Sequence, residues 1–392
     1  RPICPPDRAA QDPMPNATTI RSVQPHILMA DLAEPFAYSQ AWYRRRGAML
    51  VEVTTEDGIT GWGEAFGPPE LTAAVVAWLT PLVVGQDAMA REAIWQSLYN
   101  RLRDHGQRGI VVEAISAIDI AMWDIAGQAL GQPVHKLLGG PLRMEVEAYA
   151  TGFYRRERDD HIAYLTEEAE QRRAEGFRTL KLKTGWGLRE DIALTKAFRA
   201  AIGPDCGLLV DCNHAYDAPS AIAYGRACAD LDIGWFEEPV PPEDIAGYLE
   251  VKARQPIPVA GGEASFARWG FAEMIARRSV DILQPDVAAC GGISELKKIA
   301  DMASAFGVRV NPHVWGTGVT LAASLHLLAV LPDNPPGLFA RPPLLELDRS
   351  PHPVRDALLA QPIEAVGGRV RVPDTPGLGI TVDRAALKRF AI

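Results

Sequence analysis

The sequence lacks the features of several protein classes. Its apolar stretches are too often interrupted to cross a membrane, because even the segment 314–331 contains Gly316, Thr317, Gly318, Thr320, Ser324 and His326. The net charge of −9 leaves no basic excess of the kind that binds nucleic acid or anionic lipid. The five cysteines, an odd number without a C-x-x-C pair, favour reduced thiols in a cytoplasmic protein over a disulfide framework or a zinc site. A small-molecule substrate is therefore expected.

The first 140 residues change from one hydrophobic period to another. Residues 1–19 are rich in proline and predict a flexible leader. Residues 20–65 alternate as strands do, with Asp57-Gly58 marking a hairpin. From Leu71 to Leu130 the apolar residues recur at helical spacing. This pattern predicts an α+β capping domain over residues 20–140.

The following segment repeats a short β-rich run and an amphipathic helix. Eight such units predict a (β/α) barrel, a modified TIM barrel of the α/β class, over residues 141–354. A doubly wound sheet is less favoured because no strand leads into a G-x-G-x-x-G turn. Residues 355–392 form a C-terminal segment that we expect to return to the capping domain, with RVRVPDTPGLGITVD as one more hairpin. The strand runs are VEAYAT, TLKLK, GLLVD, IGWFEEP, IPVAGGE, DILQPD, VRVNPH and LLELD.

Charged residues end nearly all of these runs, and barrel enzymes carry their catalytic groups at the carboxyl ends of strands. The second run ends in Lys181-Leu182-Lys183, and strand alternation directs both lysines to the same face. Two crowded, partly desolvated ammonium groups lower each other's pKa. Lys183 is therefore predicted to act as a base, with Lys181 as its electrostatic neighbour, although a K-x-K sequence alone is also typical of a solvated strand end.

Three successive runs each deliver a carboxylate to the same rim. Asp211, Glu237 and Glu263 are spaced 26 residues apart, which is one βα unit. Their mutual repulsion would be costly without a cation, and a hard divalent ion, Mg²⁺, is expected. Glu238 is predicted to face away from this site, with its assignment exchangeable with that of Glu237. Asn213 shares the face of Asp211 and is a candidate substrate contact, or an ordinary turn residue.

The remaining strands supply an imidazole and two further acids. Strand six ends at Asp286 and strand seven at His313, which predicts a dyad in which the carboxylate fixes the histidine tautomer. Glu346 closes strand eight. Kept protonated or hydrogen-bonded, it would stabilise an oxygen of an enediolate; otherwise it is a surface acid.

In order along the chain, the motifs KLK, VDCN, FEEP, GGE, QPD and NPH resemble those of the enolase superfamily, specifically its mandelate racemase-like subgroup. The resemblance implies one Mg²⁺ per subunit on the three carboxylates, Lys183 as the base on one substrate face, and His313 paired with Asp286 on the other. It also implies that the loops 36–42 and 63–70 close over the barrel and define specificity. The muconate lactonising branch, with a lysine ending strand six, is disfavoured because residues 286–292 contain none. Glu346 follows His313 by 33 residues, a longer interval than expected for the subgroup.

The resemblance implies removal of the proton α to a substrate carboxylate. Polar residues near the predicted mouth favour a polyhydroxylated acid, so we expect an acid-sugar dehydratase. RDHGQRG, YATGFYRR and DCNHAYD are also similar to galactarolactone cycloisomerases, and a racemase or epimerase of an α-hydroxy acid is a further alternative. A non-catalytic sugar-acid-binding barrel would have lost a base or ligand, and a glycosidase needs no metal. A homo-oligomer is expected. The polar residues near the predicted barrel mouth, mentioned above, are His214, Trp315, Tyr216, Trp186, His105 and Arg108.

Overall fold

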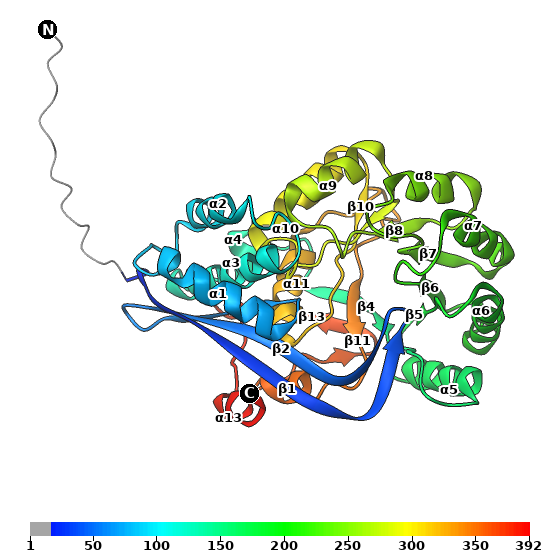
Figure 1. Cartoon of the computed structure of the whole chain (residues 1–392), viewed down its shortest axis with the longest axis horizontal. Coiled ribbons are helices and arrows are strands. Elements are labelled where there is room, and N and C mark those ends of the chain that lie inside the picture. Colours follow the sequence, from blue (N-terminus) through cyan, green and yellow to red (C-terminus); the bar gives the residue numbers. More distant parts are fainter. Residues whose placement is uncertain (1–16) are drawn as a thin grey trace, which may run out of the picture.

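In this computed structural model, which describes residues 17–392, the chain begins with an antiparallel sheet (Figure 1). The strands β1 (Ile20–Tyr38), β2 (Ala41–Thr55) and β3 (Thr60–Ala65) pair in sequence order. The predicted hairpin at Asp57-Gly58 is confirmed, and Gly58 has a φ of 86° that a side chain would disfavour. Of the predicted leader, only residues 17–19 are described. Thr18 Oγ1 donates to Asp87 at 2.7 Å, so these residues already contact the capping domain.

Four helices complete the amino-terminal domain, and two of them, α1 and α3, pack onto the sheet. Helix α3 is buried over most of its length. The approach depends on glycine, because a Cβ at Gly63 would lie 1.7 Å from the Ala117 carbonyl oxygen and one at Gly61 would lie 2.2 Å from that of Ala121. The G-W-G sequence of β3 thus lets α3 lie against the sheet without side chains between them. The helices are α1 (Pro69–Val83), α2 (Arg91–Leu102), α3 (Ile110–Ala129) and α4 (Val134–Leu137).

The eight predicted β runs all form parallel barrel strands, and helices follow them on the outside (Figure 1). The interior of the barrel is filled by large and small apolar side chains, among them Tyr149, Leu209 and Trp235. The strands are β4 (Glu145–Thr151), β5 (Thr179–Lys183), β6 (Gly207–Asp211), β7 (Ile233–Glu237), β8 (Val259–Gly261), β9 (Ile282–Leu283), β10 (Arg309–Val310) and β11 (Leu345–Asp348). The helices are α5 (His161–Ala174), α6 (Leu188–Ile202), α7 (Ala218–Ala227), the 3₁₀ turn η1 (Ala229–Leu231), α8 (Ile245–Arg254), α9 (Ala267–Arg277), α10 (Gly292–Ala305) and α11 (Gly318–Val330).

The barrel is not closed by backbone hydrogen bonds between β10 and β11. The ladder runs from β10 through β9, β8, β7, β6 and β5 to β4, and β11 pairs with β4. Two side chains bridge the remaining gap. Asn311 Oδ1 accepts from the backbone N–H of Leu344 at 2.7 Å, and Glu346 Oε2 accepts from that of Val314 at 3.2 Å. Side chains therefore hold the register where strand seven meets strand eight.

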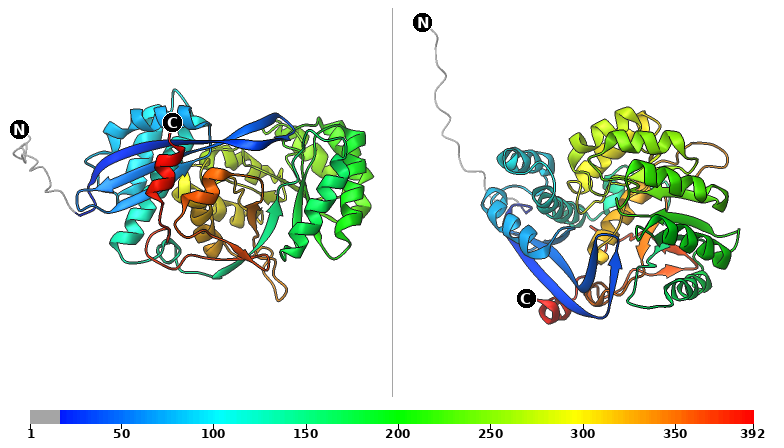
Figure 2. Two further views of the ribbon diagram at one scale, coloured as in Figure 1. Left: turned by 90° about the horizontal axis from the view of Figure 1, so that it is seen from below. Right: turned by 45° about the vertical axis from the view of Figure 1, so that its right-hand side comes forward.

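The C-terminal segment contacts both parts of the molecule. It contains α12 (Pro353–Leu358), β12 (Ala365–Val366), β13 (Arg369–Arg371) and α13 (Arg384–Phe390). The predicted hairpin over RVRVPDTPGLGITVD is wrong: the hairpin is formed earlier, by β12 and β13, and β13 pairs with barrel strand β4. Pro373 and Pro376 lack the amide donors that a second strand would need. The return to the capping domain is made by α13, which lies against β1 (Figure 2).

Two buried carboxylates of the capping domain accept hydrogen bonds from the first turns of barrel helices. Glu64 of β3 accepts four hydrogen bonds of 2.7–3.0 Å from the backbone and hydroxyl groups of Thr317 and Thr320, where α11 begins. Asp119 of α3 likewise accepts from the backbone and hydroxyl of Ser294, in the first turn of α10. Because unpaired N–H groups and the positive dipole end attract anions, both contacts fix the capping domain over the barrel mouth.

Two sequence-based expectations concern the rest of the chain. No helix among residues 17–392 combines the length and apolar character needed to cross a bilayer. Four cysteines are buried as free thiols, as expected for small apolar side chains, and Cys4 lies outside the described residues. The four are Cys206, Cys212, Cys228 and Cys290.

Candidate metal centre and active site

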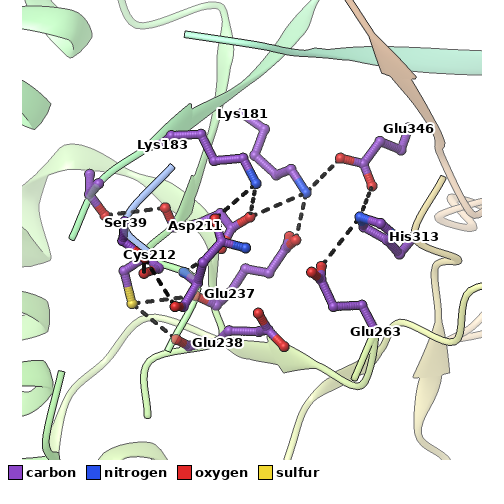
Figure 3. Close-up of polar contacts among 12 residues, drawn as sticks. Ser39, Lys181, Lys183, Asp211, Cys212, Glu237, Glu238, Glu263, His313 and Glu346 are labelled. Carbon is purple, nitrogen blue, oxygen red and sulfur yellow. Dashed lines mark hydrogen bonds and ion pairs between the residues drawn. The ribbon is translucent and has the colours of Figure 1, made fainter. Parts of the chain in front are cut away.

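Three carboxylates converge where neighbouring barrel strands end (Figure 3). Asp211 ends β6, Glu237 ends β7, and Glu263 follows β8 by two residues. One oxygen of each lies within 4.8 Å of the others. The set fits a hard divalent cation, because all donors are carboxylate oxygens, and Oε2 of Glu263 is buried without a hydrogen-bond partner among the described residues. The structure thus brings together the three carboxylates that their regular spacing in the sequence predicted to meet.

Neighbouring donors hold Glu237 in place but give Glu263 little support. Glu237 Oε2 accepts from Trp235 Nε1 at 2.8 Å and from Gln284 Nε2 at 2.7 Å. The ion-pair partner of Glu263 is the imidazole of His313, 3.4 Å from its Oε2. Burial, and then repulsion from Glu238, raises the pKa of Glu263 well above its usual value. A cation at this position would remove that penalty and keep the glutamate ionised.

The two lysines of β5 both face the carboxylates, as strand alternation predicts. The Nζ of Lys181 lies 2.5 Å from Oε1 of Glu237 and 2.7 Å from Oε1 of Glu346, and its side chain is fully buried. The Nζ of Lys183 lies 2.5 Å from Oδ2 of Asp211 and 3.1 Å from Oδ1 of Asn213. Lys183 is the one that lines the cavity described below.

The expected effect of crowding on the lysine pKa is not found. Burial alone lowers the pKa of Lys183, but attraction to Asp211 outweighs it, and the pKa lies above its ordinary value. Conversely, burial raises the pKa of Asp211, but Lys183 and Lys181 together lower it to about 2. The sequence-based expectation included only the repulsion between the two ammonium groups. In the structure each ammonium nitrogen lies 2.5 Å from a carboxylate oxygen, and this attraction is the stronger effect.

His313 lies across the carboxylate cluster from the lysines (Figure 3), and it forms the predicted dyad with Asp286. His313 Nδ1 lies 2.7 Å from Oδ2 of Asp286, and both side chains are buried. Oδ1 of Asp286 accepts from the backbone N–H of Ala288 at 2.7 Å. Burial disfavours the charged imidazole, but Glu263, Glu346 and then Asp286 raise the pKa of His313 to about 10. The surrounding carboxylates therefore favour the protonated imidazole.

Glu346 is buried beside Lys181 and His313, so it is not a surface acid. Its second oxygen accepts from the backbone of Val314. Burial raises its pKa, but Lys181 and then His313 lower it below the ordinary value. Of the two states considered from the sequence, the hydrogen-bonded one is found and the protonated one is not.

Simple alternation along the strand predicts that Glu238 points away from the site, but it does not. Its φ of 43° lies in the left-handed region, which ends the strand and turns its side chain. Its Oε2 lies 3.0 Å from Nδ1 of His214, and Oε1 is buried without a partner among residues 17–392. Asn213 also has a positive φ, of 44°, and its backbone N–H donates to Asp211 Oδ1 at 2.8 Å. Both Asn213 and His214 line the cavity, as expected.

A cavity of about 220 Å³ joins the lysine and histidine sides. The predicted residue Trp315 lines it, with the guanidinium of buried Arg46 4.0 Å from the ring centre. Sequence reasoning did not identify most of the wall, because it comes from loops and from the capping domain. Tyr38, which ends β1, and Phe66, which follows β3, lie in the two segments predicted to define specificity, although the first of these is a hairpin between strands and not an open loop. The remaining lining residues include Tyr43, Glu113, Tyr154, Ala264 and Phe266.

Four residues expected near the mouth do not line this cavity: Trp186, Tyr216, His105 and Arg108. Tyr216 instead donates to Asp191, and Arg108 borders a separate cavity of about 290 Å³ beyond Phe266. A larger hollow of about 1210 Å³ lies between Trp62 and the C-terminal segment, away from the lysines and the three carboxylates. The largest of these cavities is therefore not the one that contains the candidate catalytic residues.

Known proteins resemble this chain over nearly its whole length. The mandelate racemase / muconate lactonizing enzyme N-terminal domain matches residues 20–139, and the enolase C-terminal domain-like family matches residues 164–386. D-galactarolactone cycloisomerase of Agrobacterium fabrum is 47% identical over 371 residues, covering 95% of this chain and 98% of its own. Arabinonate dehydratase of Saccharolobus solfataricus is 37% identical over 350 residues, covering 87% and 90%.

Solved structures agree with these relatives. The 3,6-anhydro-D-galactonate cycloisomerase of Zobellia galactanivorans superposes with a TM-score of 0.87 at 38% identity, covering 95% of this chain and 99% of its own. A racemase of Streptomyces coelicolor A3(2) with bound magnesium gives a TM-score of 0.85 at 29% identity, covering 95% and 100%. The chain is therefore an enzyme of the enolase superfamily and belongs to its mandelate racemase-like subgroup.

Proposed function

We propose that the enzyme removes the proton α to the carboxylate of a sugar acid and then expels the oxygen on the β carbon. One observation carries this proposal: Lys183 and His313, which is paired with Asp286, line the same cavity from opposite sides of a three-carboxylate cluster. A substrate carboxylate held at that cluster would place its α carbon between the two.

Asp211, Glu237 and Glu263 would hold one Mg²⁺, which supplies the positive charge that an enediolate of the substrate needs. Lys183 can accept the α proton only as a neutral amine. Asp211 is the principal group that keeps it protonated; a cation held by Asp211 would weaken that attraction, and burial and Lys181 both favour the neutral form.

His313 is suited to the second proton transfer. The neighbouring carboxylates favour its protonated form, which can donate to the β oxygen as the bond from that oxygen to carbon breaks. The electron pair left on the α carbon then forms the carbon–carbon double bond, and the departing oxygen carries away the proton of His313. Lys181 forms buried ion pairs with Glu346, Glu237 and Asp211, and its positive charge would keep these carboxylates ionised.

Two leaving groups are compatible with this chemistry. Loss of hydroxide makes the enzyme an acid-sugar dehydratase, as the arabinonate dehydratase relative is named. Loss of a ring oxygen makes it a cycloisomerase of a lactone or anhydro sugar acid. The second outcome is favoured by the two cycloisomerase relatives and by the aromatic walls of the cavity, Tyr38, Tyr43, Phe66, Tyr154, Phe266 and Trp315, which suit the faces of a ring.

Proton exchange in D₂O tests the proposal. The enzyme with Mg²⁺ is incubated with aldonates, aldarates, sugar-acid lactones and anhydro acids, and NMR follows both exchange at the α carbon and the product. Lys183→Ala should abolish exchange. His313→Asn should retain exchange and lose elimination. Lys196→Ala, at an exposed position of α6, is the matched control and should behave as wild type. The proposal fails if no acid exchanges its α proton with the wild-type enzyme.

A further inference from the structure

One carboxylate of the cavity wall comes from the capping domain. Glu113 lies in the first turn of α3 and is 6% exposed. It lines the same cavity as Lys183 and His313. Two other carboxylates line this cavity, Glu263 and Glu346, and both belong to barrel strand ends. Glu113 thus faces the part of a substrate that extends from the strand ends toward the capping domain.

Glu113 has no evident structural partner. Its Oε2 is buried and accepts no hydrogen bond from residues 17–392. Glu64 and Asp119, the buried carboxylates that attach the capping domain, each accept several hydrogen bonds. An unpaired buried carboxylate oxygen is costly, so a group that serves only the fold would be expected to have donors.

The backbone around Glu113 leaves room for its carboxylate. A Cβ at Gly67, in the loop between β3 and α1, would lie 1.9 Å from Oε2 of Glu113. The neighbouring residue Phe66 contacts the ring of His313 edge-on, at 5.5 Å between centres. Burial, and then repulsion from Asp286, raises the pKa of Glu113 to about 7. The carboxylate therefore lies on the His313 side of the cavity, where the substrate's leaving group is expected.

We infer that Glu113 binds hydroxyl groups at the end of the substrate remote from its reacting carboxylate, and that it excludes a second carboxylate there. The inference rests on the proposed function and narrows its substrate class to monocarboxylates with a hydroxylated or cyclic remote end. A carboxylate accepts hydrogen bonds from hydroxyl groups, whereas two carboxylates in a buried cavity repel each other. The basic side chains of the described residues that line this cavity are Lys183, His313 and His214, and the proposed function assigns Lys183 and His313 to the reacting end.

The test compares Glu113→Gln with wild type on two substrates of the same configuration, at about pH 9, where Glu113, with its pKa of about 7, is ionised. These are the aldonate that the wild-type enzyme converts fastest and the corresponding aldarate, which has a carboxylate in place of the terminal hydroxymethyl group. The variant should lower kcat/KM for the aldonate about tenfold to a hundredfold, because one hydrogen bond to a charged group is lost. It should raise the aldarate-to-aldonate ratio of kcat/KM at least about tenfold, because the repulsion is removed.

Two controls separate recognition from folding. Glu92→Gln makes the same change at an exposed site of α2 and should leave both values unchanged. Proton exchange with lactate, which has no remote hydroxyl group, should differ less than about twofold between Glu113→Gln and wild type. Equal losses on lactate, aldonate and aldarate, together with a lowered melting temperature, would show a structural role and overturn the inference. An unchanged ratio in a stable variant would also overturn it. If the wild-type enzyme exchanges no α proton at all, the proposed function fails instead.

Discussion

Replacing Asp286 with asparagine isolates the charge of the dyad, because the side chain keeps its size. In the native protein, one oxygen of Asp286 contacts His313 Nδ1 and the other accepts from Ala288, each at 2.7 Å. An amide has a single oxygen and cannot serve both donors. If that oxygen stays with Ala288, the amide NH₂ faces Nδ1 and holds the imidazole proton on Nε2.

The size of the effect follows from the lost charge. A hydrogen bond to a charged group contributes about 1.5–3 kcal/mol, so the pKa of His313 should fall by about one to two units from its value of about 10. In addition, the amide NH₂ that faces Nδ1 opposes the proton that an imidazolium carries there, so the acid is lost in that orientation. An acid in a fixed position contributes about 10²–10⁴-fold to rate, so kcat for elimination should fall about a hundredfold or more. Proton exchange by Lys183 should remain.

Steady-state kinetics from pH 6 to 10 measure both effects. His313 donates a proton only below its pKa, so the alkaline fall of kcat should move to lower pH in Asp286→Asn. Asp301→Asn, at an exposed site of α10 that pairs with Lys297, serves as the control. If the folded variant keeps kcat within about threefold of wild type and the same alkaline limb, the assigned role of the dyad is refuted.

Three further substitutions test the metal centre and the domain contacts. Glu263→Gln removes one of three anionic ligands and should weaken Mn²⁺ binding, followed by electron paramagnetic resonance, at least about tenfold; unchanged affinity would exclude Glu263 as a ligand. Burial raises the pKa of Asp119 to about 7, above the unfolded value of about 3.9, so the folded state binds its proton more tightly and loses stability as pH rises between these values. The melting temperature of wild type minus that of Asp119→Asn should therefore decrease from pH 5 to pH 8, and a constant difference would contradict the assignment. Glu64→Ala leaves four buried donors without their acceptor and should cost about 3 kcal/mol or more in thermal unfolding; a loss below about 0.5 kcal/mol would show that the contact is not structural.

The barrel part of the site was predictable because its geometry is encoded by the βα period. Asp211, Glu237 and Glu263 recur at one position of that period, and parallel strands bring equivalent positions to one rim. The Lys181 and Lys183 side chains share a face for an equally local reason, the alternation along a strand. Such predictions need no knowledge of distant contacts.

The capping domain's contribution was not predictable in the same way. Glu113 lies in an ordinary helical pattern, and nothing in its local sequence shows that Gly67 leaves space for its carboxylate. The lysine pKa values were mispredicted for a related reason. The direction of the shift depends on which neighbours come closest, and Asp211 approaches Lys183 only after the barrel has formed. Local patterns give residue positions, whereas charge states follow from tertiary distances.

The contact between α13 and β1 joins the two ends of the described chain. Ile392 donates its backbone N–H to the carbonyl oxygen of Ile27 at 3.2 Å, and Arg384 pairs with Glu52 of β2 at 2.6 Å. The first strand of the capping sheet is therefore supported by the last helix, although the whole barrel separates the two in sequence. Removing α13 would take this support from the sheet that carries Tyr38 and Tyr43 to the cavity wall, even though no residue of α13 lines the cavity.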